Sequence, residues 1–126
     1  MYPENLKYSK EHLWVLIEGD MAKAGITDYA QKQLGNIVLL ELPESGAKAV
    51  KGKSFGVVES VKSVSDLFAP VSGEVTGVNT AATENPETVN KDPYGKGWMI
   101  EIKLADQNEL GLLLSASDYE KFIAKK

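Results

Sequence analysis

Short apolar runs, separated by glycine and polar turns, dominate the chain and predict strands rather than long helices. Residues 14–17 and 21–26 form the first pair, and the glycine-containing turn between them predicts a hairpin. A largely apolar run at residues 37–42 ends at Pro43. Residues 98–102 predict a late strand. The pattern therefore favours a mostly β chain.

Local capping signals place short helices between these strands. Thr27 is suited to cap a helix over residues 28–34, with Gly35 at the C′ position. The pair Asn85-Pro86 resembles a cap followed by proline in the first helical turn, so a single turn of helix is expected after it.

The C-terminal part of the chain shows capping-box spacing twice. Asp106 is followed by Glu109, and Ser117 is followed by Glu120. These pairs predict two short helices, the last of them over residues 117–124.

An internal repeat runs across the strand pattern. In each copy a glycine opens a strand, a valine precedes a lysine-containing turn, and an aromatic residue starts an apolar strand that ends near glutamate. The copies comprise residues 35–38, 50–53 and 55–59, and then residues 73–76, 89–92 and 98–101. Two such halves predict interlocked strands of an all-β flattened barrel, with the connecting hairpin on the outside.

That connecting segment, residues 55–70, carries the most informative residue. Both arms are rich in β-branched and aromatic residues, and small or polar residues surround Lys62 where the hairpin turns. Ala69-Pro70 closes the second arm. A lysine at such a tip is presented to another protein's active site, and its amine is a common target of modification.

The composition excludes several functions. The chain has no cysteine and no arginine, so all 14 basic residues are lysines, and disulfides and thiolate metal sites are ruled out. His12 has no second histidine or cysteine with which to bind a metal, and is expected to be a satisfied surface or semi-buried residue rather than a ligand. A net charge of -4 and a pI near 5.0 argue against nucleic-acid binding.

Length and hydropathy predict one soluble domain over residues 1–126. The N-terminal residues show no signal-peptide pattern, and no apolar stretch is long enough to span a membrane. A cytoplasmic, monomeric protein is expected. Glu59 and Asp66 flank the hairpin tip, and we interpret them as recognition or solubility residues rather than as an acid/base pair, because carboxylates beside an exposed turn are normally solvated.

The hairpin and its surroundings resemble a known family. The run Glu59-Ser60-Val61-Lys62-Ser63, followed by Ala69-Pro70-Val71-Ser72-Gly73-Glu74-Val75, resembles the lipoyl-attachment hairpin of glycine cleavage system H proteins. The resemblance extends from about Lys7 to Phe122. Other matching segments are Gly25-Ile26-Thr27-Asp28-Tyr29-Ala30-Gln31, Leu34-Gly35-Asn36, Glu41-Leu42-Pro43, Val78-Asn79, Asn90-Lys91-Asp92-Pro93-Tyr94, Gly97-Trp98-Met99 and the tail from Leu112-Leu113 to Tyr119.

The resemblance implies a carrier rather than an enzyme. Its fold would be the lipoyl/biotinyl-type barrel-sandwich hybrid, with short peripheral helices and a C-terminal helix. Lys62 would hold lipoate in amide linkage, and Glu59, Ser60 and Asp66 would serve hairpin recognition. The arm would shuttle the aminomethyl group of glycine from a glycine decarboxylase (P protein) to an aminomethyltransferase (T protein). A dihydrolipoamide dehydrogenase (L protein) would reoxidise it, and a lipoate ligase or octanoyl transferase would supply the modification. No nucleic acid and no membrane are implied as partners.

Two residues depart from the family pattern. Family members typically read His-Glu-Trp where this chain has His12-Leu13-Trp14, and they often have histidine where Gln33 stands. The resemblance associates these positions with the groove that shelters the loaded arm. Leu13 cannot accept a hydrogen bond and Gln33 cannot titrate, so poorer sheltering is expected.

Alternatives to the glycine cleavage role remain. A stand-alone H-like lipoate relay or regulatory protein would keep the hairpin and relax the groove. A biotin carrier would typically show Met-Lys-Met, but Val61 and Ser63 flank Lys62 here. A lipoyl domain of a 2-oxoacid dehydrogenase would typically have aspartate before the lysine. An unmodified interaction module with the same fold is the last alternative.

Overall fold

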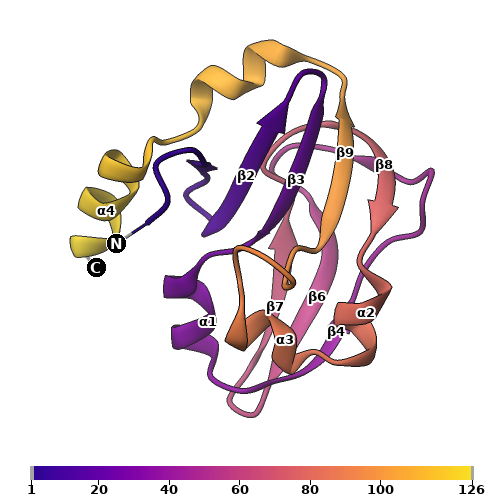
Figure 1. Ribbon diagram of the computed structural model, residues 1–126, viewed down its shortest axis with the longest axis vertical. Helices are drawn as coiled ribbons and strands as arrows, with labels where there is room; N and C mark the ends of the chain where they lie inside the picture. The colour runs from indigo at the N-terminus through magenta and orange to yellow at the C-terminus, as the bar shows by residue number, and fades with distance from the viewer. Residues whose placement is uncertain (1, 126) are drawn as a thin grey trace.

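A computed structural model describes residues 2–125 and contains two antiparallel sheets joined by short helices (Figure 1). One sheet has the strand order β1-β2-β3-β9-β8-β5, and the other has the order β4-β6-β7. The strands are β1 (Lys7–Tyr8), β2 (Leu13–Glu18), β3 (Met21–Ile26), β4 (Ile37–Glu41), β5 (Lys48–Ala49), β6 (Ser54–Ser60), β7 (Val64–Phe68), β8 (Gly73–Val78) and β9 (Ile100–Leu104). The predicted mostly-β fold with short helices is confirmed. The strand pairing stays within the two sheets and does not close into a barrel over the described residues.

Within residues 2–125, five short helical segments connect or follow the strands. They are α1 (Asp28–Leu34), α2 (Thr80–Glu84), α3 (Glu87–Lys91), the 3₁₀ helix η1 (Gln107–Leu112) and α4 (Ala116–Ala124). Helix α1 has the predicted bounds, residues 28–34. At its start the Ala30 N–H donates to Thr27 Oγ1 at 3.2 Å, and at its end the Gly35 N–H donates to the Gln31 carbonyl at 2.9 Å. The helix expected after Pro86 is confirmed as α3, whereas α2, capped by the Asn79 side chain, was missed.

Of the two predicted C-terminal helix caps, one is confirmed and one is wrong. Asp106 caps η1 as expected. The last helix, however, is capped by Ser115 and not by Ser117, because the Asp118 N–H donates to Ser115 Oγ at 3.1 Å. Ser117 therefore lies inside the first turn. The late strand also starts two residues further on than predicted, at Ile100.

The main core fills the space between the two sheets. Alternate positions of the strands point inward, as a period of two requires. Val15, Ala22, Ile100 and Val75 line it from the large sheet, and Ile37, Leu40, Val58 and Leu67 line it from the small one. This core fixes the position of the small sheet, and with it the β6–β7 hairpin.

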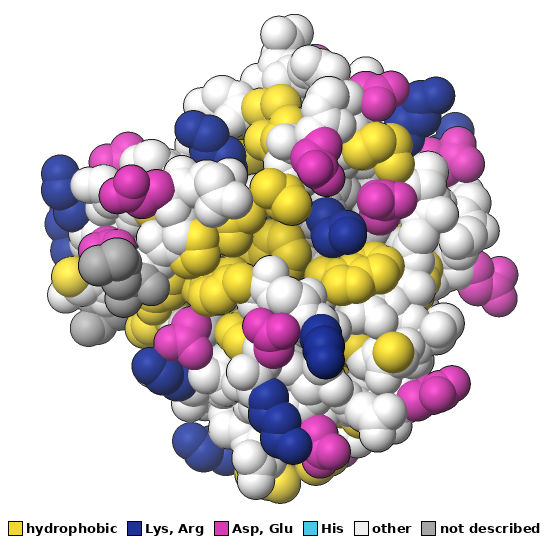
Figure 2. All heavy atoms as spheres, in the orientation of Figure 1, with side chains coloured by type: hydrophobic (Ala, Val, Ile, Leu, Met, Phe, Trp, Pro, Cys, Tyr) yellow, Lys and Arg dark blue, Asp and Glu magenta, His cyan; other side chains and the backbone are white. Residues whose placement is uncertain are grey.

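A second apolar cluster lies under α4. On the face shown in Figure 2, hydrophobic side chains also gather at the surface over β2 and β3. Tyr119 of α4 stacks on Tyr8 with ring centroids 4.8 Å apart. Trp14 is buried in the same cluster and donates through Nε1 to the Pro93 carbonyl at 2.8 Å. A β-carbon on Gly25 would lie 2.9 Å from Trp14 Nε1, so glycine is required there. The Tyr2 N–H donates to the Glu120 carboxylate at 3.3 Å, which holds the two chain ends side by side (Figure 1).

The strands follow the predicted repeat, but the segments that connect them differ between the two copies. The first copy gives the antiparallel pair β4 and β6, and the second gives the antiparallel pair β8 and β9. Residues 50–53 form a turn, as expected. Residues 89–92 instead end helix α3, and Val89 is buried in the core whereas Val50 is exposed. The prediction of a lysine-containing turn in the second copy is therefore wrong.

Candidate functional site: the Lys62 hairpin and its groove

Lys62 lies exposed in the turn, residues 61–63, between β6 and β7. Figure 1 shows this tip at the bottom of the view, next to the segment that leaves α1. Glu59 and Asp66 are on facing arms, as predicted. They are not directly opposite each other, because Glu59 pairs with Val64 and Asp66 pairs with Val57.

The Ser60 side chain organises this turn. Its Oγ accepts the backbone N–H groups of Lys62 and Ser63, each at 3.1 Å, and donates to the Ser63 carbonyl at 3.3 Å. The Ser60 N–H donates to the same carbonyl at 2.8 Å. Since Ser60 is only 6 % exposed, its hydroxyl is committed to the turn. The lysine is thus held by a fixed backbone while its own side chain reaches solvent.

The turn is also bonded to the segment between α1 and β4. The Val61 N–H donates to the Asn36 carbonyl at 3.0 Å. The Lys62 stem lies against Gly35, where an added β-carbon would be 3.3 Å from Lys62 Cε. Gly35 has a φ of 79°, in the region that favours glycine. Glycine at this position therefore ends the helix and leaves room for the lysine.

A groove of about 450 Å³ runs between α1, the start of β2 and the β7 edge of the small sheet. Its apolar lining is Leu13, Ile26, Ala30, Leu34, Val58, Leu67 and Phe68, and its polar lining is Glu11, His12, Tyr29, Gln33, Ser65 and Asp66. Leu13 and Gln33, the two departures from the family pattern, therefore both face this groove. Leu13 is 1 % exposed and belongs to the main core, whereas Gln33 is exposed. Lys62 does not line the groove itself, but its stem packs on Gly35, the residue that follows Leu34 of the lining.

The Tyr119 hydroxyl connects the segments that form two walls of the groove. Tyr119 OH lies 2.8 Å from His12 Nδ1 and 2.8 Å from Thr27 Oγ1, which caps α1. His12 has a φ of 71°, and its ring packs on Tyr29 with centroids 4.9 Å apart. Burial raises the pKa of Tyr119, so the hydroxyl stays protonated and able to donate. The expectation of a semi-buried, satisfied His12 is confirmed.

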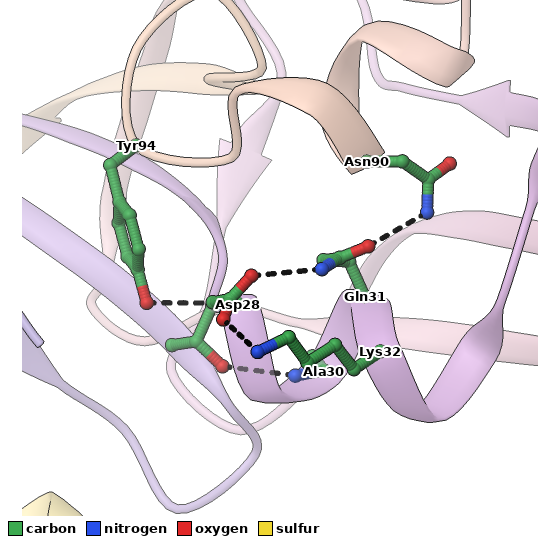
Figure 3. A network of polar contacts seen from close by, with 7 residues as sticks. Asp28, Ala30, Gln31, Lys32, Asn90 and Tyr94 are labelled. Atoms are coloured by element: carbon green, nitrogen blue, oxygen red, sulfur yellow. Dashed lines mark hydrogen bonds and ion pairs between the residues drawn. The ribbon is translucent and has the colours of Figure 1, made fainter. Parts of the chain in front are cut away.

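A polar network crosses the outer side of α1 (Figure 3). Asp28 Oδ2 lies 2.9 Å from Lys32 Nζ, and Gln31 Nε2 donates to Asp28 Oδ1 at 2.8 Å. The hydrogen bond from Lys32 is the largest cause of the lowered pKa of the Asp28 carboxyl. The Asp28 N–H donates to the Tyr94 hydroxyl at 2.9 Å, and the Asn90 amide donates to Gln31 Oε1 at 2.9 Å. Segments 28–32 and 90–94 are therefore bound to each other beside the groove.

These contacts were not evident in the sequence, because their partners are far apart in the chain. Tyr119 and His12 are 107 residues apart, and Asn90 and Gln31 are 59 residues apart. The family-like run from Asn90 to Tyr94 was the available signal for the second contact.

Within residues 2–125, no group of three or more histidine, cysteine, aspartate or glutamate side chains is arranged to hold a metal ion. No helix in that range is long and apolar enough to cross a membrane. What the fold provides is an exposed lysine on a braced hairpin, beside a mainly apolar groove. This arrangement agrees with the hairpin lysine that the sequence predicted.

Comparison with known proteins gives the family. The model of the glycine cleavage H-protein family matches residues 6–126. A glycine cleavage system H protein of Carboxydothermus hydrogenoformans is 54% identical over 98% of this chain and 95% of its own length. The H protein of Koribacter versatilis is 55% identical over 99% of this chain and 96% of its own. The chain belongs to the glycine cleavage H-protein family.

The fold agrees with that assignment. The crystal structure of a glycine cleavage system H protein from Mycobacterium marinum superposes with a TM-score of 0.85, at 40% sequence identity over 94% of this chain and 95% of that one. The family and the fold together support the lipoyl-carrier role in the glycine cleavage system that the sequence predicted.

Proposed function

We propose that Lys62 carries lipoate in amide linkage and that this chain presents the arm to the enzymes of glycine cleavage. The observation that carries the proposal is the position of the lysine. Lys62 is exposed, yet the backbone of its turn is fixed by the Ser60 hydroxyl, which accepts the Lys62 N–H, and by the Asn36 carbonyl, which accepts the Val61 N–H. A flexible side chain on a rigid support gives a tethered group a high effective concentration at a docked partner.

The groove fits such a group. An acylated lysine is an uncharged, mainly aliphatic chain, and the groove beside Lys62 is lined largely by aliphatic side chains. Asp66 and Gln33 supply polar atoms in the same lining. When bound, the dithiolane supplies a sulfur pair that carries a one-carbon amine unit and two electrons, functions that this cysteine-free chain lacks.

The residues of this chain present, recognise and shelter the arm rather than carry out chemistry on it. The hairpin backbone orients Lys62 Nζ. Glu59 and Asp66 flank the tip and are proposed as recognition residues for the lipoate ligase or octanoyl transferase. Ser60 is proposed to serve the same recognition by fixing the shape of the turn. The glycine decarboxylase, the aminomethyltransferase and the dihydrolipoamide dehydrogenase would then bind the arm in turn, with the carrier acting as a cytoplasmic monomer.

A lipoate relay remains the second candidate, because Leu13 and Gln33 change the groove without touching the hairpin. Both residues line the groove. A relay needs the attachment site and does not need a polar groove that holds an amine. Purification of the lipoylated protein with its partners distinguishes the two roles, since recovery of lipoyl-transfer enzymes without the decarboxylase favours the relay.

Peptide mass mapping after expression with lipoate tests the attachment. We expect a lipoyl adduct on Lys62 and its loss in Lys62→Arg. Lys53→Arg is the matched control, because Lys53 is also an exposed lysine, in the turn that precedes β6. An adduct on another lysine, or one that persists in Lys62→Arg, would contradict the proposal.

A further inference from the structure

The side-chain amide of Asn90 holds the backbone at the end of α1. Asn90 lies on α3 and is half-buried. Its Nδ2 donates to the Gly35 carbonyl and to Gln31 Oε1, each at 2.9 Å, and its Oδ1 accepts the Ile37 N–H at 2.9 Å. Figure 3 shows this amide directed at α1. Because one planar amide binds the residues before and after Asn36, it fixes the path of the backbone through that residue.

Residues 35–37 are also the support on which the hairpin tip rests. The Asn36 carbonyl accepts the Val61 N–H at 3.0 Å, and Gly35 packs against the stem of Lys62. The contacts therefore continue from Asn90 through residues 35–37 to Val61 and Lys62. The proposed attachment of lipoate to Lys62 does not itself involve Asn90.

We propose that Asn90 is a positioning residue for Lys62: by fixing residues 35–37, it sets where the hairpin tip lies relative to α1 and the groove. The consequence for modification rests on the proposed attachment of lipoate to Lys62, whereas the positioning is a property of the unmodified chain. Transfer of an acyl group requires the amine at close range and in the correct direction. A displacement of about 1 Å can cost as much as about a hundredfold in rate.

Two variants and one control test this assignment. Asn90→Ala removes all three side-chain hydrogen bonds. Asn90→Asp keeps the acceptor for the Ile37 N–H but places an oxygen against the Gly35 carbonyl and Gln31 Oε1, so it removes the donors with almost no change in shape. Asn85→Ala is the matched control, because Asn85 is an exposed asparagine just before α3.

The first measurement is amide hydrogen exchange in the unmodified proteins. We expect exchange at Val61 to rise about tenfold more than exchange at Ile102 in both Asn90 variants. Ile102 is fully buried in β9 and reports on global unfolding. In Asn85→Ala the ratio of the two exchange rates should equal that of the wild type.

The second measurement is the rate of lipoyl transfer to Lys62 by a lipoate ligase. We expect kcat to fall about fivefold or more in both Asn90 variants with little change in KM, because the hairpin surface stays exposed while the amine is misplaced. A merely structural role would lower stability and leave the kcat of the folded protein unchanged.

Two results would overturn the assignment. One is an equal rise in exchange at Val61 and Ile102, which indicates general destabilisation. The other is a wild-type kcat in both Asn90 variants. If even the wild type accepts no lipoyl group, the proposed attachment fails instead, and the ratio of Val61 to Ile102 exchange still decides whether Asn90 positions the turn.

Discussion

The Tyr119 hydroxyl lies 2.8 Å from His12 Nδ1, and this contact joins the C-terminal helix to the start of β2. The same hydroxyl lies 2.8 Å from Thr27 Oγ1, the cap of α1. The groove beside Lys62 is bounded by the segments that carry both partners. Helix α4 thus stabilises the groove although it contributes no residue to its lining.

Replacing Tyr119 with phenylalanine is therefore expected to loosen both walls. Tyr119→Phe keeps the ring stacked on Tyr8 but removes the hydroxyl that lies 2.8 Å from both His12 Nδ1 and Thr27 Oγ1. The free energy of unfolding should fall by about 1–3 kcal/mol. Urea unfolding measures the loss. Tyr29→Phe is the control, since it removes a hydroxyl from another ring that packs on His12. Equal stability of Tyr119→Phe and wild type would show that the hydroxyl does not brace the groove.

The acid dependence of stability should report on Asp28. Its pKa is lowered in the folded state, chiefly by the hydrogen bond from Lys32. A lowered pKa means that Asp28 contributes stability above its unfolded pKa of about 3.9, and that this contribution is lost as pH falls through the folded value. Wild type should therefore be more stable than Asp28→Asn at pH 7, and the difference should shrink as the medium is acidified below about pH 4.

Chemical unfolding of both proteins at several pH values measures that difference. Asp118→Asn is the control, because Asp118 also lies in the first turn of a helix and reports the general effect of a negative charge there. A difference that stays constant down to about pH 2 would mean that the Asp28–Lys32 pair does not stabilise the fold. Added salt should also reduce the difference at pH 7, since Lys32 is exposed.

Local signals were enough to predict α1 and the hairpin. Thr27 and Gly35 adjoin the helix that they delimit, and the arms of the hairpin differ clearly in composition from its turn. The last helix shows where such signals become ambiguous. Ser115 with Asp118 and Ser117 with Glu120 both have cap-like spacing. Packing decides between them, because a start at Ala116 buries both Ala116 and Tyr119.

The position of Lys62 was predictable from the chain, but the support of its turn was not. Ser60 acts on its own neighbours, yet nothing in the sequence shows that its hydroxyl faces inward. The bonds from Asn90 to Gly35 and Ile37 span 55 and 53 residues. Such contacts depend on how α3 packs beside β4, which capping signals and periodicity do not determine.

Removing the Ser60 hydroxyl should loosen the turn without unfolding the protein. Ser60→Ala removes the acceptor for the Lys62 and Ser63 N–H groups. Amide exchange at these two residues should accelerate about fivefold to tenfold, the effect of losing a hydrogen bond worth about 1 kcal/mol or slightly more. Exchange at buried positions of β9 should change much less. Ser63→Ala is the control, because Ser63 is exposed and contributes to the turn through its backbone. Unchanged exchange at residues 62 and 63 would contradict the role of Ser60.

The last prediction concerns Leu13 and the sheltering of a cationic amine at the end of the loaded arm. A sheltered ammonium group is best held by a carboxylate, and Leu13 faces the groove where the resemblance implies glutamate. We expect Leu13→Glu to slow spontaneous loss of the aminomethyl group about tenfold or more, since a charge-assisted hydrogen bond is worth about 1.5–3 kcal/mol.

Because Leu13 is 1 % exposed, the substitution should also lower stability, and the comparison needs a variant with the same packing. Leu13→Gln provides it: glutamine has the shape of glutamate without the charge. The measurement is the decay rate of the loaded species for wild type and both variants at fixed pH and salt. A slower decay in Leu13→Glu than in Leu13→Gln assigns the effect to the carboxylate. Equal rates in the two variants would mean that another group in the groove, such as Asp66, already holds the amine.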